Sequence, residues 1–380
     1  MEKGNEIKTV VPALRFPEFQ NTESWKEYKL KSLCEIGNGK DYKHLGRGNI
    51  PVYGSGGYMT SVDDFLYDGE SVCIGRKGTI DKPIFLTGKF WTVDTLFYTH
   101  SFHNCLPKFL YLIFQQINWY KYNEAGGVPS LSKTTIGEIN VFVPVGEKGE
   151  LKEQQKIVDC IFSLNELIEA TAQKVEALKE HKKGLIQRLF PTGSKDVPDL
   201  RFPEFQGVKK WERKIIQDIC NITTGNKNTQ DKKENGIYPF FVRSPKVERI
   251  DSWSFDGEAI LTAGDGVGVG KIFHYYVGKM GVHQRVYLLY NIQCNSKYLY
   301  YFFSEFFYER VKKMSAKNSV DSVRKDMISD MPLLLPSFHE QEKIADCLSS
   351  LDELIEVTSR KVEILKEHKK GLMQQLFPKI

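Results

Sequence analysis

The sequence predicts an α+β protein, in which two similar mixed α/β domains are separated by two long helices. Three observations support this fold class. The chain of 380 residues repeats itself over almost its whole length, the most similar segments have the heptad periodicity of a coiled coil, and the regions between them alternate strand-like runs with glycine turns. A chain of this length has room for more than one domain, each with its own core.

The repeat is clearest in the octapeptide LKEHKKGL, which occurs at residues 178–185 and again at residues 365–372. It belongs to a longer match, in which residues 153–191 align without gaps to residues 340–378. A second pair of matching segments lies upstream, where VPALRFPEF begins at Val11 and VPDLRFPEF begins at Val197. The chain is therefore a fused pair of related halves, not a solenoid of many short repeats.

These matches divide the chain into six parts. In chain order we predict an N-terminal tail at 1–10, a first domain at 11–149, a first conserved helix at 150–191, a linker at 192–196, a second domain at 197–336 and a second conserved helix at 337–378. Within each domain, short runs such as SVCIG and AILTA are typical of strands, and the aromatic segments 108–123 and 297–314 are typical of helices packed on a sheet.

Apolar residues in the two conserved segments alternate at spacings of four and three, which predicts a coiled-coil seam. Its positions are Ile157, Ile161, Leu164, Ile168, Thr171, Val175, Leu178, Leu185 and Leu189 in the first segment, and Ile344, Leu348, Leu351, Ile355, Thr358, Val362, Leu365, Leu372 and Leu376 in the second. The alternative is that each helix packs only on its own domain. Because a long narrow seam suits pairing with another long helix, we expect an antiparallel coiled coil that relates the two domains by a pseudo-twofold axis.

The composition narrows the class of protein. Hydrophobic residues make up 41% and charged residues 27%, which is typical of a folded globular chain. No segment approaches the ~20 apolar residues of a membrane span, and no secretory signal is recognisable, so we expect a cytoplasmic protein. Seven cysteines without a CxxC pair indicate reduced thiols, and the formal charge of +5 permits a polyanionic partner without requiring one.

The sequence contains no recognisable catalytic or metal centre. The glycine-rich stretch AGDGVGVGKI at 263–272 fits neither GxGxxG nor GxxxxGK[ST], so a hairpin or bulge is the better interpretation than a nucleotide site. There is no tetrapeptide of the kind used for amino methylation of a base, no Ser/His/Asp set in an elbow, and no Cys/His cluster at metal-ligand spacing. We predict no catalytic residues, no metal ligands and no cofactor.

Basic, amide and hydroxyl side chains gather instead in loops of the two domains. Arg, Lys, Asn and Gln read guanine and adenine edges in the major groove, and Lys and Ser contact phosphates. An ordinary solvated loop is the alternative for any one of these residues. The predicted DNA-binding residues are Lys40, Tyr42, Lys43, His44, Arg47, Ser55, Tyr58, Arg76, Lys77, Lys133, Lys227, Asn228, Arg243, Ser244, Lys246, Lys271, His283, Gln284, Arg285 and Lys325.

Taken together, residues 11–378 resemble the specificity (S) subunits of type I restriction–modification systems. The motifs that carry the resemblance are the two LRFPEF…W openings, the closings at 131–144 and 323–336, and the helical segments EQ.KI ending in LKEHKKGL.Q.LFP. The resemblance implies a non-catalytic, DNA-binding subunit of an anti-phage defence complex. Each of its two target-recognition domains would read one half of a bipartite, asymmetric DNA site, while the helices set the spacer and dock two modification (M) subunits.

In such a complex, adenine-N6 methylation and ATP-dependent cleavage belong to the M and restriction (R) subunits, and the latter join through the M–S core. S-adenosylmethionine, ATP and Mg²⁺ are therefore expected in the partners. Two other functions stay open at this point. A coiled-coil adaptor that binds no DNA would not need divergent basic loops, and a self-contained DNA-modifying enzyme would need a cofactor or metal motif of its own.

Overall fold

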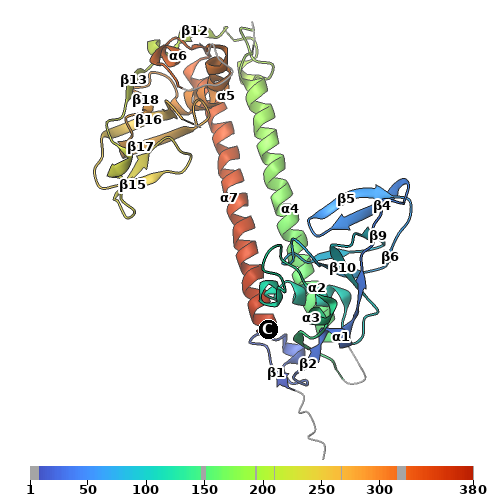
Figure 1. Ribbon diagram of the computed structural model, residues 1–380. Helices are drawn as coiled ribbons and strands as arrows, with labels where there is room; N and C mark the ends of the chain where they lie inside the picture. The colour runs from blue at the N-terminus through green and yellow to red at the C-terminus, as the bar shows by residue number, and fades with distance from the viewer. Residues whose placement is uncertain are drawn as a thin grey trace, which may run out of the picture. The chain divides into compact units, whose positions relative to one another are not determined.

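The structure is a computed structural model that describes residues 8–146, 151–192, 195–208, 210–266, 268–314 and 322–379. The predicted tail at 1–10 and linker at 192–196 lie partly outside these residues. The chain divides into two compact units (Figure 1): unit 1 is Met1–Thr171 with Lys361–Ile380, and unit 2 is Ala172–Arg360. The predicted class is confirmed, because each unit combines β-sheets with helices and two long helices are present.

The described residues of unit 1 form three sheets and three short α-helices besides the ends of the two long helices. A three-stranded sheet has the order β1 (Thr9–Val10), β2 (Trp25–Lys29), β11 (Asn140–Val143). Two four-stranded sheets have the orders β3 (Glu35–Asn38), β10 (Leu96–His100), β7 (Ser71–Gly75), β8 (Ile84–Leu86), and β5 (Gly57–Val62), β4 (Arg47–Gly54), β9 (Lys89–Thr92), β6 (Tyr67–Asp68). The helices are α1 (Leu30–Leu33), α2 (Pro107–Phe114) and α3 (Lys133–Gly137).

Unit 2 repeats this plan with fewer sheets. A two-stranded sheet joins β12 (Glu212–Ile215) and β19 (Pro332–Leu335). A six-stranded sheet has the order β13 (Asn221–Thr224), β18 (Val286–Tyr290), β16 (Phe255–Ala263), β17 (Phe273–Val282), β14 (Tyr238–Phe241), β15 (Glu248–Ile250). The helices of the domain are α5 (Ser296–Met314) and α6 (Lys325–Ser329).

The two units differ in the number of sheets because one strand is continuous in unit 2 and interrupted in unit 1. In unit 2, β17 is continuous, so it pairs antiparallel with β16 along its first part and parallel with β14 at its end. In unit 1 the corresponding chain is broken into β8 and β9 around Gly88. Gly88 and the matching Gly278 within β17 both have a positive φ, +70° and +125°, so this glycine conformation is common to both units. The parallel pairing survives the break, because Val52 of β4 still lies opposite Trp91 of β9.

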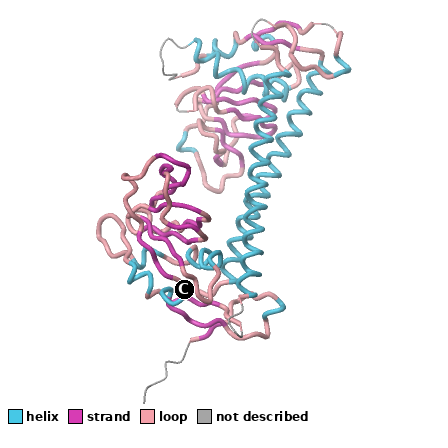
Figure 2. The backbone as a smooth tube through the Cα atoms, turned by 90° about the vertical axis from the view of Figure 1, so that its right-hand side faces the viewer, coloured by secondary structure: helices cyan, strands magenta, loops and turns pink. Residues whose placement is uncertain are grey.

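The conserved segments form α4 (Lys152–Leu189) and α7 (Phe338–Leu376), which Figure 2 shows as unbroken helices. Each of the predicted seam positions is buried or half-buried. The two seam threonines are satisfied within their own helices, since the Thr171 and Thr358 hydroxyls donate to the carbonyls four residues earlier at 2.6 Å. The proton of each hydroxyl is therefore used within its own helix.

The C-terminal end of each long helix is buried in a domain from the other half of the sequence. The end of α7 lies in the core of unit 1, and the end of α4 lies in the core of unit 2. In unit 1, Phe377 after α7 packs on Phe109 and Trp25, with ring centroids 5.3 and 6.0 Å apart. In unit 2, Phe190 after α4 packs in the same way on Tyr298, at 5.1 Å. Each domain core is therefore completed by a segment from the opposite half of the sequence.

Unit 2 shows the direction in which its two long-helix segments pair. Lys182 of α4 bonds Asp352 of α7 at 2.5 Å and lies over the Tyr301 ring of α5 at 4.9 Å. Further along α4, Leu189 shares a core with Ile344, which precedes Asp352 in α7. The two segments therefore run antiparallel within this unit.

Candidate nucleic-acid interface

Two turns occupy the same topological position in the two units. Residues 93–96 connect β9 to β10, and residues 283–286 connect β17 to β18. In each turn the last N–H donates to the first carbonyl at 2.9 Å. The tip residues that these turns expose wholly or in part are Asp94 and Thr95 in unit 1, and Gln284 and Arg285 in unit 2.

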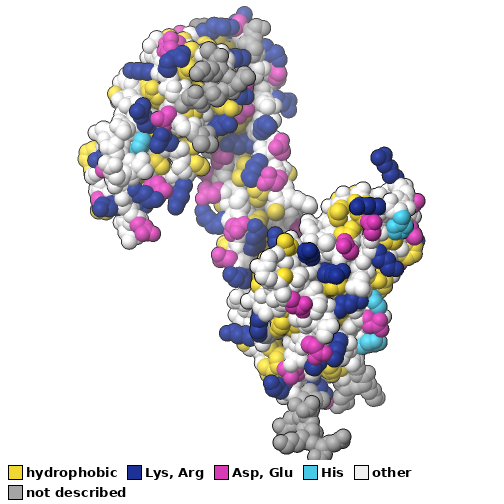
Figure 3. Space-filling model, viewed as in Figure 1, with side chains coloured by type: hydrophobic (Ala, Val, Ile, Leu, Met, Phe, Trp, Pro, Cys, Tyr) yellow, Lys and Arg dark blue, Asp and Glu magenta, His cyan; other side chains and the backbone are white. Residues whose placement is uncertain are grey.

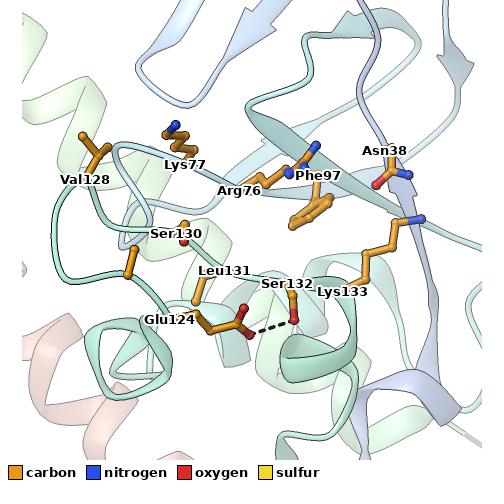
Figure 4. Close-up of a pocket in the computed structure, with 11 residues that line it drawn as sticks. Asn38, Arg76, Lys77, Phe97, Glu124, Val128, Ser130, Leu131, Ser132 and Lys133 are labelled. Carbon is orange, nitrogen blue, oxygen red and sulfur yellow. Dashed lines mark hydrogen bonds between the residues drawn. The ribbon is translucent and has the colours of Figure 1, made fainter.

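A cavity of about 730 Å³ lies beside the unit 1 turn (Figure 4). Three predicted DNA-binding residues line it: Arg76, Lys77 and Lys133. The Arg76 N–H donates to the Thr95 carbonyl at 2.8 Å, and the Arg76 carbonyl accepts from the Leu131 N–H at 2.9 Å. Segments that are distant in sequence are thus held together around this cavity by backbone hydrogen bonds.

The same cavity contains a carboxylate that sequence analysis did not predict. Glu124 accepts hydrogen bonds from the Thr135 and Ser132 hydroxyls, the latter at 2.8 Å (Figure 4). The bond from Thr135, followed by that from Ser132, lowers the pKa of Glu124. The cavity therefore presents a fixed acceptor among cations, which suits a ligand that carries both donors and acceptors, such as a base edge.

A second cavity of unit 1, about 570 Å³ in volume, brings together Tyr42, Lys43, Ser55 and Tyr58. It also includes the turn residues Asp94 and Thr95, and the Thr95 carbonyl accepts from the N–H of Arg76, which lines the first cavity. The remaining predicted residues lie near β4 and β9: Lys40 and Arg47 are exposed, and the His44 ring contacts the Trp91 ring at 5.8 Å.

In unit 2 two predicted arginines meet at an aspartate. Arg243 Nη1 lies 2.7 Å from Asp265 Oδ1, and Arg285 Nε lies 3.7 Å from Asp265 Oδ2. Beside them, Gln284 is exposed, and its N–H donates to the Lys227 carbonyl at 2.9 Å. These residues come from four separate segments, one of which is the unit 2 turn itself.

His283 is buried beneath this turn. Its Nδ1 accepts the Arg285 N–H at 3.0 Å, and its Nε2 lies 3.2 Å from the Thr229 hydroxyl. Burial, and then repulsion by Arg243, lower the pKa of His283, so the imidazole is neutral with its proton on Nε2. This histidine supports the turn from within.

The other predicted residues of unit 2 are distributed over its loops and helix starts. The Lys227 ammonium donates to the Ser252 hydroxyl at 2.9 Å, and the Ser244 hydroxyl accepts the Lys246 N–H at 3.1 Å. Asn228 is half-buried where its loop begins, Lys271 lies over the Tyr308 ring at 4.7 Å, and Lys325 begins α6 as Lys133 begins α3. Figure 3 shows basic and acidic side chains mixed over the visible faces of both units.

A signal for Asp265 is present in the sequence. In the match of YDGESVCIGRKG to FDGEAILTAGDG, Asp265 aligns with Lys77. The two residues occupy equivalent positions in the structure, because the backbone of Lys77 forms an isolated β-bridge with Ser130 and that of Asp265 forms one with Ser322. Opposite charges therefore occupy one position of a shared frame. A search for basic and amide side chains alone could not find this aspartate.

Among the described residues, no group of three or more His, Cys, Asp or Glu side chains could hold a metal ion. None of the helices in the described part of the chain is long and apolar enough to cross a membrane.

Comparison with known proteins gives one consistent family. The model described as "Type I restriction modification DNA specificity domain" matches residues 22–180 and again residues 208–367. The chain is 29% identical over 171 residues to the type I restriction enzyme EcoDI specificity subunit of Escherichia coli, a match that covers 44% of this chain and 37% of that protein. It is 22% identical over 348 residues to the MjaVIII specificity subunit of Methanocaldococcus jannaschii, covering 82% and 77% of the two proteins.

Among solved structures, the chain resembles the type I restriction–modification S subunit from M. genitalium, with a TM-score of 0.70. The identity is 15%, and the match covers 98% of this chain and 100% of that one. At this identity the likeness is one of fold.

Proposed function

The chain belongs to the type I restriction–modification DNA specificity family and recognises DNA sequence through two target-recognition domains, and we propose that each domain reads one half of a bipartite, asymmetric site. We assign the domains to residues 11–149 and 197–336. An adaptor without DNA and a self-contained modifying enzyme are not favoured, because both halves of the chain match the specificity domain.

One observation carries this proposal. The two units present different chemical groups from matched positions: Asp94 and Thr95 against Gln284 and Arg285 at the turn tips, and Lys77 against Asp265 beside them. Acidic side chains accept from cytosine N4, whereas Gln and Arg pair with adenine and guanine. Two domains that share a fold but recognise different half-sites need different side chains at matched positions.

We place methyl transfer and cleavage in partner subunits, together with S-adenosylmethionine, ATP and Mg²⁺. The partners are double-stranded DNA, two M subunits and, through them, R subunits. Support for two equal docking sites comes from the octapeptide, whose Lys179, Lys183, Lys366 and Lys370 are all exposed. Beyond the backbone of its own helix and its chain neighbours, a methyl group added at Gly184 or Gly371 would meet nothing within 4 Å, so a partner could approach both helices closely.

We further propose that α4 and α7 set the length of the unspecified spacer, since both helices contain residues of unit 1 and of unit 2. A helix that is continuous over 38 residues is a suitable spacer because its rise of ~1.5 Å per residue is fixed by its hydrogen bonds.

The test is a pair of measurements on the purified chain. With labelled S-adenosylmethionine, the chain alone should leave DNA unmodified, and together with M subunits it should direct methylation to one bipartite sequence. Its own DNA binding should weaken steeply with salt, because phosphate contacts release counterions. Methylation by the chain alone, or equal methylation of all sequences with M subunits, would overturn the proposal.

A further inference from the structure

The arginine pair of unit 2 has the features of a prepared base-reading group. Arg243 and Arg285 retain 42% and 65% of their side-chain exposure, and the Asp265 between them retains 25%. Ion pairs this exposed contribute little to stability, so stabilisation of the fold does not explain why these three residues lie together. Two cations around one carboxylate also leave a net positive charge, which favours a partner rich in acceptors.

The backbone under these side chains is held at several points. The Gly264 N–H donates to the Arg285 carbonyl at 2.8 Å, and the buried His283 ring accepts the Arg285 N–H at 3.0 Å. A recognition side chain discriminates best when its support is fixed before binding. The Arg285 side chain therefore extends from a turn whose backbone is held by hydrogen bonds, so only its own rotamers need to become ordered when DNA binds.

The Asp265 carboxylate lies beside the Arg285 guanidinium. Asp265 Oδ2 lies 3.7 Å from Nε of Arg285, and the Arg285 side chain is 65% exposed, so its outer end is accessible to a ligand. Two parallel N–H donors match the O6 and N7 acceptors of guanine in the major groove. The other oxygen of the same carboxylate holds Arg243 at 2.7 Å and neutralises part of the repulsion between the two arginines.

We propose that Asp265 is a positioning residue, which holds Arg285 beside Arg243 so that Arg285 reads one guanine in the half-site recognised by unit 2. This inference rests on the proposed function and adds a base and its reader to it. Unit 1 lacks the device: at the matched positions it carries Lys77 in place of Asp265 and Thr95 in place of Arg285. The guanine requirement belongs to one half-site only.

The experiment uses the complete chain, produced with its M subunits in a host whose methylated adenines are mapped by sequencing. In the R285A variant, one position of the unit 2 half-site that requires guanine in the wild type should accept any base, while the sequence of the other half-site stays unchanged. In D265N, the ratio of methylation at guanine sites to methylation at other sites should fall about ten-fold or more, a typical value of one bidentate contact. D265E should restore most of this ratio.

The matched control is K312A, which removes one cation of an exposed ion pair elsewhere in unit 2 and should leave every letter unchanged. Thermal unfolding of each variant checks that it is folded. If R285A and D265N are folded and keep the same letters in both half-sites, or if D265N weakens methylation of all sequences equally, the inference is wrong. A wild-type chain that directs no methylation would overturn the proposed function as well.

Discussion

The guanidinium of Arg15 donates from Nε and Nη2 to the two carboxylate oxygens of Glu153, at 2.7 and 2.6 Å. Arg201 makes the same two-pronged contact with Glu340 in unit 2, at 2.7 Å for both bonds. The LRFPEF openings and the EQ.KI helix starts therefore bind each other in both halves of the chain. In both units this contact fastens the beginning of the domain to the long helix that follows it.

Breaking one of these buried pairs should destabilise its unit strongly. The Glu340 side chain is 1% exposed, so the E340Q variant removes the buried carboxylate that pairs with the Arg201 guanidinium. We expect a loss of about 3–5 kcal/mol in the free energy of unfolding of unit 2, measured by denaturant titration. The K343Q variant, which removes an exposed pair with Glu204, is the control and should unfold like the wild type. An E340Q chain as stable as K343Q would contradict this explanation.

Part of this fold could be predicted from the sequence, because heptad spacing and strand-like runs are local properties. The aromatic segment 108–123 was harder: instead of one helix it forms α2 and a separate 3₁₀ turn at Trp119–Tyr122, where the Trp119 indole donates to the Phe114 carbonyl at 2.9 Å. The exchange of helix ends and the role of Asp265 depend on which distant segments meet, which spacing along the chain does not reveal.

The exchanged helix ends lead to a second prediction. Phe377 is near the C-terminus, yet it is buried on Trp25 and Phe109 of unit 1. F377A should therefore destabilise unit 1 by about 3–5 kcal/mol. F190A is its matched partner and should destabilise unit 2. Hydrogen exchange followed by mass spectrometry distinguishes the two units. Faster exchange in unit 2 alone on F377A would show that this packing is absent in solution.

Thiol reactivity provides a third prediction. Burial raises the pKa of Cys34, Cys73 and Cys220 to about 12, so these thiols are protonated at pH 8 and unreactive. Cys160 and Cys347 are half-buried at matching positions on the long helices. Brief alkylation of the native chain at pH 8 should label these two alone, whereas all seven cysteines should react after unfolding. Labelling of Cys34 before Cys160 would contradict the burial described.

Charge reversal on the octapeptide tests the docking of M subunits. Lys179 and Lys183 are exposed, so K179E/K183E should leave the chain folded and lower the number of bound M subunits in native mass spectrometry, and K366E/K370E should do the same from the other helix. The matched control is K174E/K361E, which reverses two exposed lysines just outside the octapeptide. A complex of unchanged mass that binds DNA weakly would assign these lysines to DNA instead.

The helices as a spacer can be tested by insertion. Thr171 ends the first segment of unit 1 and Ala172 begins unit 2, so four residues inserted after Thr171 fall between the units. They add ~6 Å of helical rise, and a coiled coil can absorb such a stutter by local unwinding. At ~3.4 Å per base pair, the unspecified gap should lengthen by about one or two pairs. An active complex with an unchanged gap would show that the helices do not set the length of the spacer.

The most direct test of the account is to exchange one target-recognition domain and map the methylated sequence. Residues 20–143 would be replaced by the same region of a relative with another specificity, and the chain would be produced with its M subunits in a host without other adenine methylation. Because the core of unit 1 is separate from that of unit 2, we expect one half of the recognised site to change and the other to keep each of its letters. A change in both halves, or in neither, would contradict the claim that two independent domains read the two halves of the site.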